Sequence, residues 1–322
     1  DGGAPSPPVV MALSSGLRVA PQTFLDAAHE FLETVYDGLD DGYTIAAEDN
    51  NARGGNVGET DTAASSSSTC NEFLYGELTP KGVRQLFDLP EVRHALSLDS
   101  LDGATLREEG QQQIMDRRSF VDLGSGVGKL VLEAACLLNA PRMLLSPPPS
   151  RSFVPCIGVE LIASRHAVAM EAVERCGLLL GASGFSDPAS SPSSNFVANA
   201  SKLAAAVQQG GLGLVQPVLG SFFETFPGED TAAVCFACAL GFDEALTTQL
   251  CDRILGMSQK GMLKCAVLLL RKVPMAHPIF VTPGVSSAAT PEQEEGEGRR
   301  GRAVHLETTW MNEAPAILLT FP

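Results

Sequence analysis

The distribution of apolar and polar residues along the chain predicts strands that alternate with helices. Short apolar runs rich in Val, Leu, Phe and Cys predict seven strands, whereas longer runs with apolar residues at helical spacing predict the helices between them. The predicted strands begin at Phe120 and cover 156–161, 214–224, 232–240, 262–272, 304–311 and 316–322, and helices follow at 130–139, 163–177 and 242–255. This order predicts an α/β fold with a mostly parallel seven-stranded sheet, closed by a terminal antiparallel hairpin whose polar turn is 312–315.

The rest of the chain divides into an N-terminal part and a large domain. Residues 1–20 are Pro-rich and aperiodic and are expected to be disordered. Residues 21–70 are expected to form an amphipathic helix over 21–39, packed against the core, and a flexible linker rich in Gly and Ser. Residues 71–322 form the predicted domain, with low-complexity insertions at about 140–155, 181–196 and 283–302.

The stretch FVDLGSGVGK, residues 120–129, carries the main chemical signal of the sequence. A strand, a glycine turn and a helix place backbone N–H groups at the carboxyl edge of a sheet, where a nucleotide-like ligand binds. Glu160, at the end of the next apolar run, can accept hydrogen bonds from both ribose hydroxyls of an adenosine. Asp122 places negative charge beside the turn and favours a cationic cofactor, S-adenosylmethionine (SAM). A dinucleotide site and a purely structural turn are the alternatives.

Further candidate ligand contacts lie on either side of this turn. Tyr75, Gly76 and Glu77 precede a helix start at Thr79-Pro80 and can close over a ligand; alternatively, Tyr75 is a packing anchor and Glu77 a surface charge. Ser221 and Phe222 lie at the end of the third predicted strand and can bracket an adenine, although Phe222 is equally suited to the core.

Composition limits the class of protein. The 322 residues include 44% apolar residues and carry a net charge of −16, which opposes nonspecific binding to nucleic acid and leaves basic protein partners open. The longest apolar runs are far shorter than the ~20 residues that span a bilayer, so we expect no membrane segment. The eight cysteines and five histidines lack metal-ligand spacing, which predicts buried thiols and no metal site. The chain does not begin with methionine, so we expect a fragment or a processed form.

These motifs together resemble the non-SET histone-lysine methyltransferases of the "disruptor of telomeric silencing" family, a branch of the class I SAM-dependent methyltransferases. The resemblance covers roughly 70–275 and is most specific in FVDLGSGVGK, the alanine-rich helix after it, IGVE, and the earlier YGE. It implies a Rossmann-like class I methyltransferase fold, SAM as cofactor, and methylation of a lysine in the globular core of histone H3.

The resemblance also implies roles for individual residues. The implied cofactor-binding residues are Tyr75, Gly76, Glu77, Leu78, Asp122, Gly124, Ser125, Gly126, Gly128, Lys129, Glu160, Ser221 and Phe222. Tyr75, Phe236 and Cys238 are placed at the reacting centre. Family members commonly carry two asparagines after the fourth strand, where this chain has FACA at 236–239, and usually an aspartate where it has Ser221. Histone H3 or the nucleosome is the implied partner, and the nucleus is the implied location.

DNA bases are disfavoured as methyl acceptors. The fourth strand is not followed by the Asn/Asp-Pro-Pro-aromatic tetrad of amino-methyltransferases that act on bases, and neither Cys235 nor Cys238 follows a proline. Another protein, a small molecule, or a non-catalytic role in binding SAM remain as alternatives to histone methylation.

Overall fold

The computed structural model describes most of the predicted domain and a short N-terminal segment. The described residues are 29, 31–39, 77–96, 98, 118–143, 154–182, 214–261, 263–280, 301–309 and 311–322. The predictions for 1–20, 47–70, Tyr75, Gly76 and most of the three insertions lie outside these residues.

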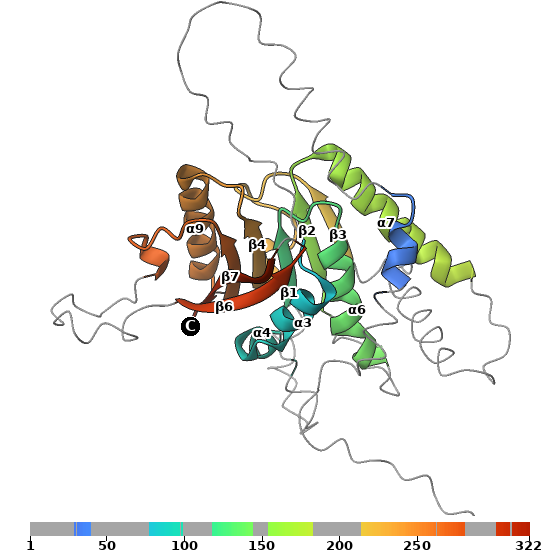
Figure 1. Cartoon of the computed structure of the whole chain (residues 1–322), viewed down its shortest axis with the longest axis horizontal. Helices are drawn as coiled ribbons and strands as arrows, with labels where there is room; N and C mark the ends of the chain where they lie inside the picture. The colour runs from blue at the N-terminus through green and yellow to red at the C-terminus, as the bar shows by residue number, and fades with distance from the viewer. Residues whose placement is uncertain are drawn as a thin grey trace, which may run out of the picture.

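A seven-stranded sheet forms the centre of the molecule (Figure 1). The strand order is β3-β2-β1-β4-β5-β7-β6; the first five strands are parallel, and β7 is antiparallel to both β5 and β6. The strands are β1 (Ser119–Leu123), β2 (Cys156–Glu160), β3 (Val215–Leu219), β4 (Ala232–Ala239), β5 (Cys265–Leu270), β6 (Gly301–Thr308) and β7 (Met311–Thr320). The α/β fold expected from the sequence, a mostly parallel seven-stranded sheet with a terminal antiparallel hairpin, is thereby confirmed.

Helices cover both faces of this sheet. They are α3 (Pro80–Asp88), α4 (Pro90–Ala95), α6 (Lys129–Met143), α7 (Ala163–Ala182) and α9 (Glu244–Gln259), with short 3-10 turns η2 (Glu229–Thr231) and η3 (Pro278–Phe280). Apolar side chains of α3, α4 and α6 pack on one face, and α9 packs on the opposite face through Leu250, Ile254 and Met257. Strand residues point alternately to the two faces, so the central strands are apolar throughout.

The N-terminal helical segment, residues 31–36, packs against the domain as expected. Leu32 and Val35 are buried in one cluster with Leu132 of α6 and with Ala172 and Cys176 of α7. The segment therefore covers the groove between the helices that follow β1 and β2.

The terminal hairpin differs from the prediction in its turn. β6 ends at Thr308 and β7 begins at Met311, so the connection is residues 309–310, and the predicted turn at 312–315 lies inside β7. Pro315 pairs with His305 of β6 but lies beyond Ile317, the last β7 residue paired with β5. Its missing N–H therefore costs no bond to β5, and a proline can continue the strand.

Several other boundaries shift. β3 ends at Leu219 rather than at 224, and α7 continues to Ala182, inside the second insertion. β6 begins at Gly301, inside the stretch assigned to the third insertion, and α6 continues to Met143, inside the first. Of the described helices, none combines the length and apolar character needed to cross a membrane.

Candidate functional site

The turn between β1 and α6 lies against the end of β2. Gly124, Gly126 and Gly128 all have positive φ angles, of 84°, 58° and 83°, a backbone region that favours glycine. The N–H groups of Gly124 and Ser125 both donate to the carbonyl of Val159, at 2.8 and 3.1 Å. A Cβ at Gly158 would lie 2.7 Å from Ser125 Oγ, so glycine in β2 permits this close approach.

Glu160 joins the end of β2 to this turn. Its carboxylate is buried; Oε2 accepts from the N–H of Gly126 at 2.8 Å, and Oε1 accepts from the N–H of Ile162 at 2.7 Å. A carboxylate offers about four acceptor positions, so each oxygen keeps one for a ligand donor. These two acceptor positions fit the two hydroxyls of a ribose, which would donate to them.

Asp122 is a buried acid beside Glu160. Burial, and then the negative charge of Glu160, raise its pKa to about 8. A carboxyl group held in this way is protonated near neutral pH, and a nearby cation would favour its ionised form. Asp122 also lines the cavity described next.

A cavity of about 520 Å³ opens in front of the turn. Its wall combines residues of the N-terminal segment, of 77–80, of the turn, of α6 and of the end of β4, together with Thr309. The predicted site residues on this wall are Glu77, Leu78, Asp122, Gly124, Ser125, Lys129, Phe236 and Cys238. Segments far apart in the sequence thus meet at the carboxyl edge of the sheet, where α/β folds bind ligands.

The predicted adenine pair, Ser221 and Phe222, does not line this cavity but lies next to the turn. The N–H of Gly220 donates to the carbonyl of Glu160, and Ser221 Oγ accepts from the N–H of Phe223 at 3.2 Å. Phe222 is buried and stacked on Phe242, with ring centroids 6.1 Å apart. A Cβ added to Gly124 would meet only the ring of Phe222, at 3.9 Å, so there is open space above Gly124 next to that ring.

The remaining predicted residues are not part of the cavity wall. Gly126 and Gly128 belong to the turn, and Glu160 reaches the turn through Gly126. Tyr75 and Gly76 lie outside the described residues.

Lys129 links the turn to the segment before α3. Its Nζ lies 3.1 Å from Glu77 Oε2 and 5.6 Å from the centre of the Tyr36 ring. Tyr36 in turn donates its hydroxyl hydrogen to the carbonyl of Val127 at 2.9 Å, and burial, together with Glu77, raises its pKa well above the usual value. The N-terminal segment is therefore part of the site.

Sequence reasoning missed Tyr36 in this role, because the helical pattern identified the segment only as a packing element. The available signal was a tyrosine on an otherwise apolar face, since a partly buried phenol usually finds an acceptor for its hydroxyl group.

Acidic side chains outnumber basic ones on the cavity wall. They are Glu33, Asp37, Glu77, Asp122 and Glu133, against the ammonium group of Lys129. Burial raises the pKa of Glu133 to about 7; Arg84 opposes this shift and Glu77 adds to it. Such a wall favours a cationic ligand. Within the described ranges, no group of three or more His, Cys, Asp or Glu side chains is arranged to hold a metal ion.

Phe236 and Cys238 close the cavity at the end of β4. Phe236 is 3% exposed and belongs to the core under α3 and α6, and burial raises the pKa of the Cys238 thiol to about 12. Cys238 is therefore an uncharged thiol at neutral pH, and both side chains contribute an apolar wall rather than a nucleophile.

Comparisons with known proteins add little to this geometry. No family model matches the sequence, and no curated protein matches it. Among solved structures, the chain is similar to the CcbJ methyltransferase from Streptomyces caelestis, with 16% sequence identity and a TM-score of 0.27. The similarity covers 62% of this chain and 57% of that one, so the chain spans less than two thirds of that methyltransferase. A likeness this weak carries no conclusion about function.

Proposed function

We propose that this protein is a SAM-dependent methyltransferase whose acceptor is a lysine amine of another protein. The observation that carries the proposal is the contact between Glu160 and the N–H of Gly126, which joins the acid of β2 to the glycine turn of β1 beside an acid-lined cavity. A turn with open space above Gly124, next to an acid with free acceptor positions, suits an adenosine-containing ligand.

The cofactor is assigned to specific residues in this proposal. Glu160 holds the ribose, Ser221 and Phe222 hold the adenine, and Asp122 and Glu77 face the methionine end. When bound, SAM supplies a methyl group on a positively charged sulfur. The protein then has to align the acceptor and exclude water, which Phe236 and the N-terminal segment do by closing the cavity.

A lysine acceptor fits the charge of the cavity. An ammonium group is attracted by Glu77 and by the ionised form of Glu133, but it has to lose a proton before it can attack, and its ordinary pKa is about 10.4. Glu133 lies on the same wall with a pKa near 7 and is suited to take that proton. The apolar wall formed by Phe236 favours the neutral amine.

Histone H3 in the nucleosome is the proposed acceptor, and the nucleus is the proposed location. Both rest on the family resemblance alone. Another basic protein would satisfy the same acidic cavity.

Replacement of Glu160 tests the cofactor site. Glu160→Ala removes two charge-assisted hydrogen bonds to the ribose, each worth roughly 1.5–3 kcal/mol, so SAM affinity measured by calorimetry should fall at least tenfold. Glu160→Gln preserves the shape of the side chain and should also weaken binding. Glu171→Ala, at an exposed ion pair on α7, is the matched control and should bind SAM as the wild type does. Wild-type affinity in both Glu160 variants would mean that the ribose lies elsewhere.

The acceptor is tested separately. The protein is incubated with SAM labelled in the methyl group and with nucleosomes, free histones or cell extract. Label on H3 would support the histone assignment. Label in the extract but never on H3 would replace it with a different protein or a small molecule.

A second candidate is a non-catalytic protein that binds SAM. The observation in its favour is that the described residues lining the cavity include no asparagine or glutamine, so no side-chain amide is available there to orient an acceptor amine. SAM binding without transfer to any component of the extract would favour this candidate.

A further inference from the structure

The segment 77–80, which forms one wall of the cavity, is paired with the terminal hairpin. Leu78 and Thr308 form an antiparallel bridge. The N–H of Thr79 donates to the carbonyl of Glu307 at 3.1 Å, and the N–H of Thr309 donates to the carbonyl of Glu77 at 2.9 Å. The segment thus adds a short backbone pairing to the end of β6, although the two stretches lie 228 positions apart in the sequence.

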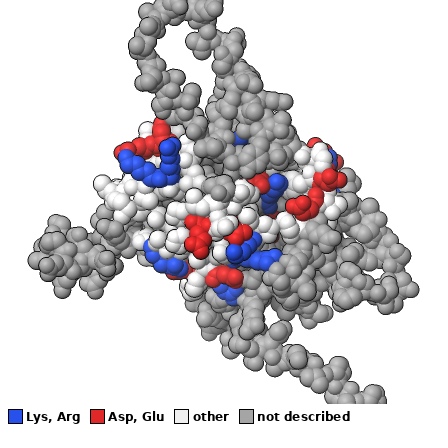
Figure 2. Space-filling model, in the orientation of Figure 1, with Lys and Arg blue, Asp and Glu red and all other residues white. Residues whose placement is uncertain are grey.

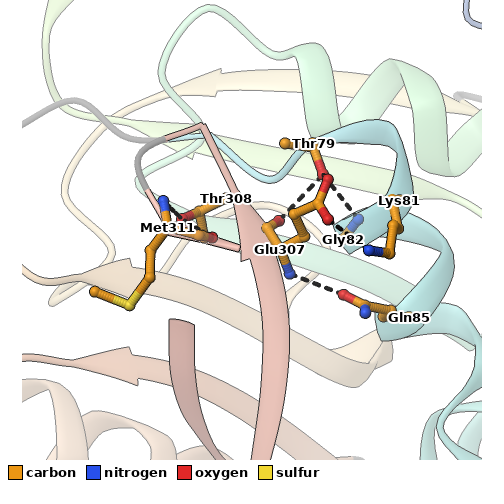
Figure 3. Close-up of polar contacts among 7 residues, drawn as sticks. All are labelled: Thr79, Lys81, Gly82, Gln85, Glu307, Thr308 and Met311. Atoms are coloured by element: carbon orange, nitrogen blue, oxygen red, sulfur yellow. Dashed lines mark hydrogen bonds and ion pairs between the residues drawn. The ribbon is translucent and has the colours of Figure 1, made fainter. Parts of the chain in front are cut away.

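The side chain of Glu307 adds a second set of contacts with the start of α3 (Figure 3). Its Oε1 accepts from the hydroxyl of Thr79 at 2.9 Å, and its Oε2 lies 2.7 Å from Nζ of Lys81. The backbone N–H of Glu307 donates to Oε1 of Gln85 at 2.8 Å. One residue of β6 therefore contacts each of the first two turns of α3.

Thr79 is also the N-cap of α3. Its Oγ1 accepts from the N–H of Gly82 at 3.1 Å while its hydroxyl hydrogen points to Glu307. Since a threonine hydroxyl has one hydrogen and two lone pairs, both contacts are made at once. A Cβ at Gly82 would lie 1.9 Å from the carbonyl oxygen of Glu307, so glycine is required for α3 to approach β6 this closely.

The ion pair between Lys81 and Glu307 does not by itself hold the segment 77–80 against β6. Lys81 is 65% exposed, and ion pairs of this kind contribute little to stability. Lys81, and then Thr79, hold the pKa of Glu307 below its usual range. The contact that connects to the cavity is the one through Thr79, because Thr79 is covalently joined to Leu78 and Glu77.

We propose, taking the cofactor site above as the premise, that Glu307 is a positioning residue that holds the segment 77–80 in place over the bound ligand. The hydrogen bond from Thr79 fixes the cap of α3 and the residues just before it. Glu77 is thereby kept within reach of Lys129 at the start of α6, and the hairpin, the cavity wall and the glycine turn form one connected unit.

The experiment compares Glu307→Ala, Glu307→Gln and Glu91→Ala in the full chain. Glu91 of α4 forms a paired contact with Arg302 at the other end of β6, at 2.9 and 2.8 Å, and does not line the cavity, so it is the matched control for loss of a surface ion pair on this strand. The measurements are SAM affinity by calorimetry and hydrogen exchange of the amides in 77–83 without ligand.

We expect Glu307→Ala to raise exchange in 77–83 about tenfold and to weaken SAM binding about fivefold, because the binding-competent position of the wall is less populated. Glu307→Gln keeps an oxygen that accepts from Thr79 and should retain most of both properties. Glu91→Ala should change neither.

The proposal is overturned if Glu307→Ala leaves exchange and affinity as in the wild type, or if Glu91→Ala changes both to the same extent. If the wild type does not bind SAM, the proposed function fails. The exchange comparison still decides whether Glu307 holds the wall.

Discussion

Asp122 illustrates how a single buried residue can connect stability to ligand binding. The carboxyl group is 4% exposed and next to the charge of Glu160, and its pKa of about 8 lies far above the ordinary value for aspartate. A cationic ligand would favour the charged form, so its binding should release a proton below that pH. The sequence predicted a negatively charged Asp122 beside the turn. The position is as predicted, but the charge is not: burial, a property of the folded chain, keeps the carboxyl group protonated near neutral pH.

Asp122→Asn tests this effect on stability. Between about pH 4, where an exposed aspartate titrates, and about pH 8, the folded wild type binds one more proton than the unfolded chain, so the free energy of unfolding falls as the pH rises. The asparagine variant lacks this proton uptake. We expect it to be more stable than the wild type at pH 8, with a difference that shrinks toward pH 4, in thermal unfolding followed across the pH range.

The pKa of Glu133 is also raised. Because Glu133 is present in both the wild type and the variant, its effect on stability cancels when the two are compared. A difference in melting temperature that is constant from pH 4 to pH 8 would contradict the assignment.

At the scale of elements, the sequence predicted the existence and order of the strands because each is a short apolar run between turn signals. α9 begins at Glu244, two residues after the predicted start at 242, because Asp243 caps it and accepts from the N–H of Leu246 at 2.8 Å. The predicted position of the hairpin turn was wrong by a few residues. The polar stretch 312–315 has the composition of a turn, but pairing with β6 keeps it extended. The bridge between Leu78 and Thr308 could not be predicted from the sequence, because the residues around Leu78 and around Thr308 show no pattern that indicates that the two pair.

The N-terminal segment provides a prediction at this scale. Leu32→Ala removes a side chain buried against Leu132, Ala172 and Cys176, and a substitution of this type costs about 2–5 kcal/mol when the surroundings do not collapse. We expect the free energy of unfolding, measured with denaturant, to fall by an amount in this range. Tyr36 should then lose its contact with Val127, and hydrogen exchange in 31–39 should rise.

Glu33→Ala is the control on the same segment. Its side chain is 72% exposed and lies 3.6 Å from His29, so we expect a change within about 0.5 kcal/mol. Equal stability of Leu32→Ala and Glu33→Ala would mean that this segment does not fold together with the domain.

At the scale of the whole molecule, the net charge and its distribution favour basic proteins over DNA as partners. The net charge is −16, and Figure 2 shows lysine and arginine side chains next to acidic ones on the visible face rather than gathered in one basic patch. Pairs such as Lys272 with Glu244 and Arg302 with Glu91 account for this mixing. The described residues on this face do not provide the cluster of cations that replaces counterions on DNA.

We therefore expect the protein to leave naked duplex DNA unshifted in a gel assay at about 50 mM salt, where nonspecific electrostatic binding is strong. Free histones, which are basic, serve as the positive comparison in a pull-down at the same salt. A DNA shift that disappears as salt rises would contradict the expectation and would point to a basic surface outside the described residues.

The pairing of Glu77 and Thr79 with residues 307–309 also affects how the protein matures during synthesis. On the ribosome, a nascent chain that has not yet passed Thr309 already contains the glycine turn and Glu160, but the partner strand for the cavity wall is still missing. Long-range contacts of this kind form late. The newly made protein should therefore acquire its full ligand affinity only after translation has moved past the hairpin, and shortened translation products would compete poorly for the cofactor.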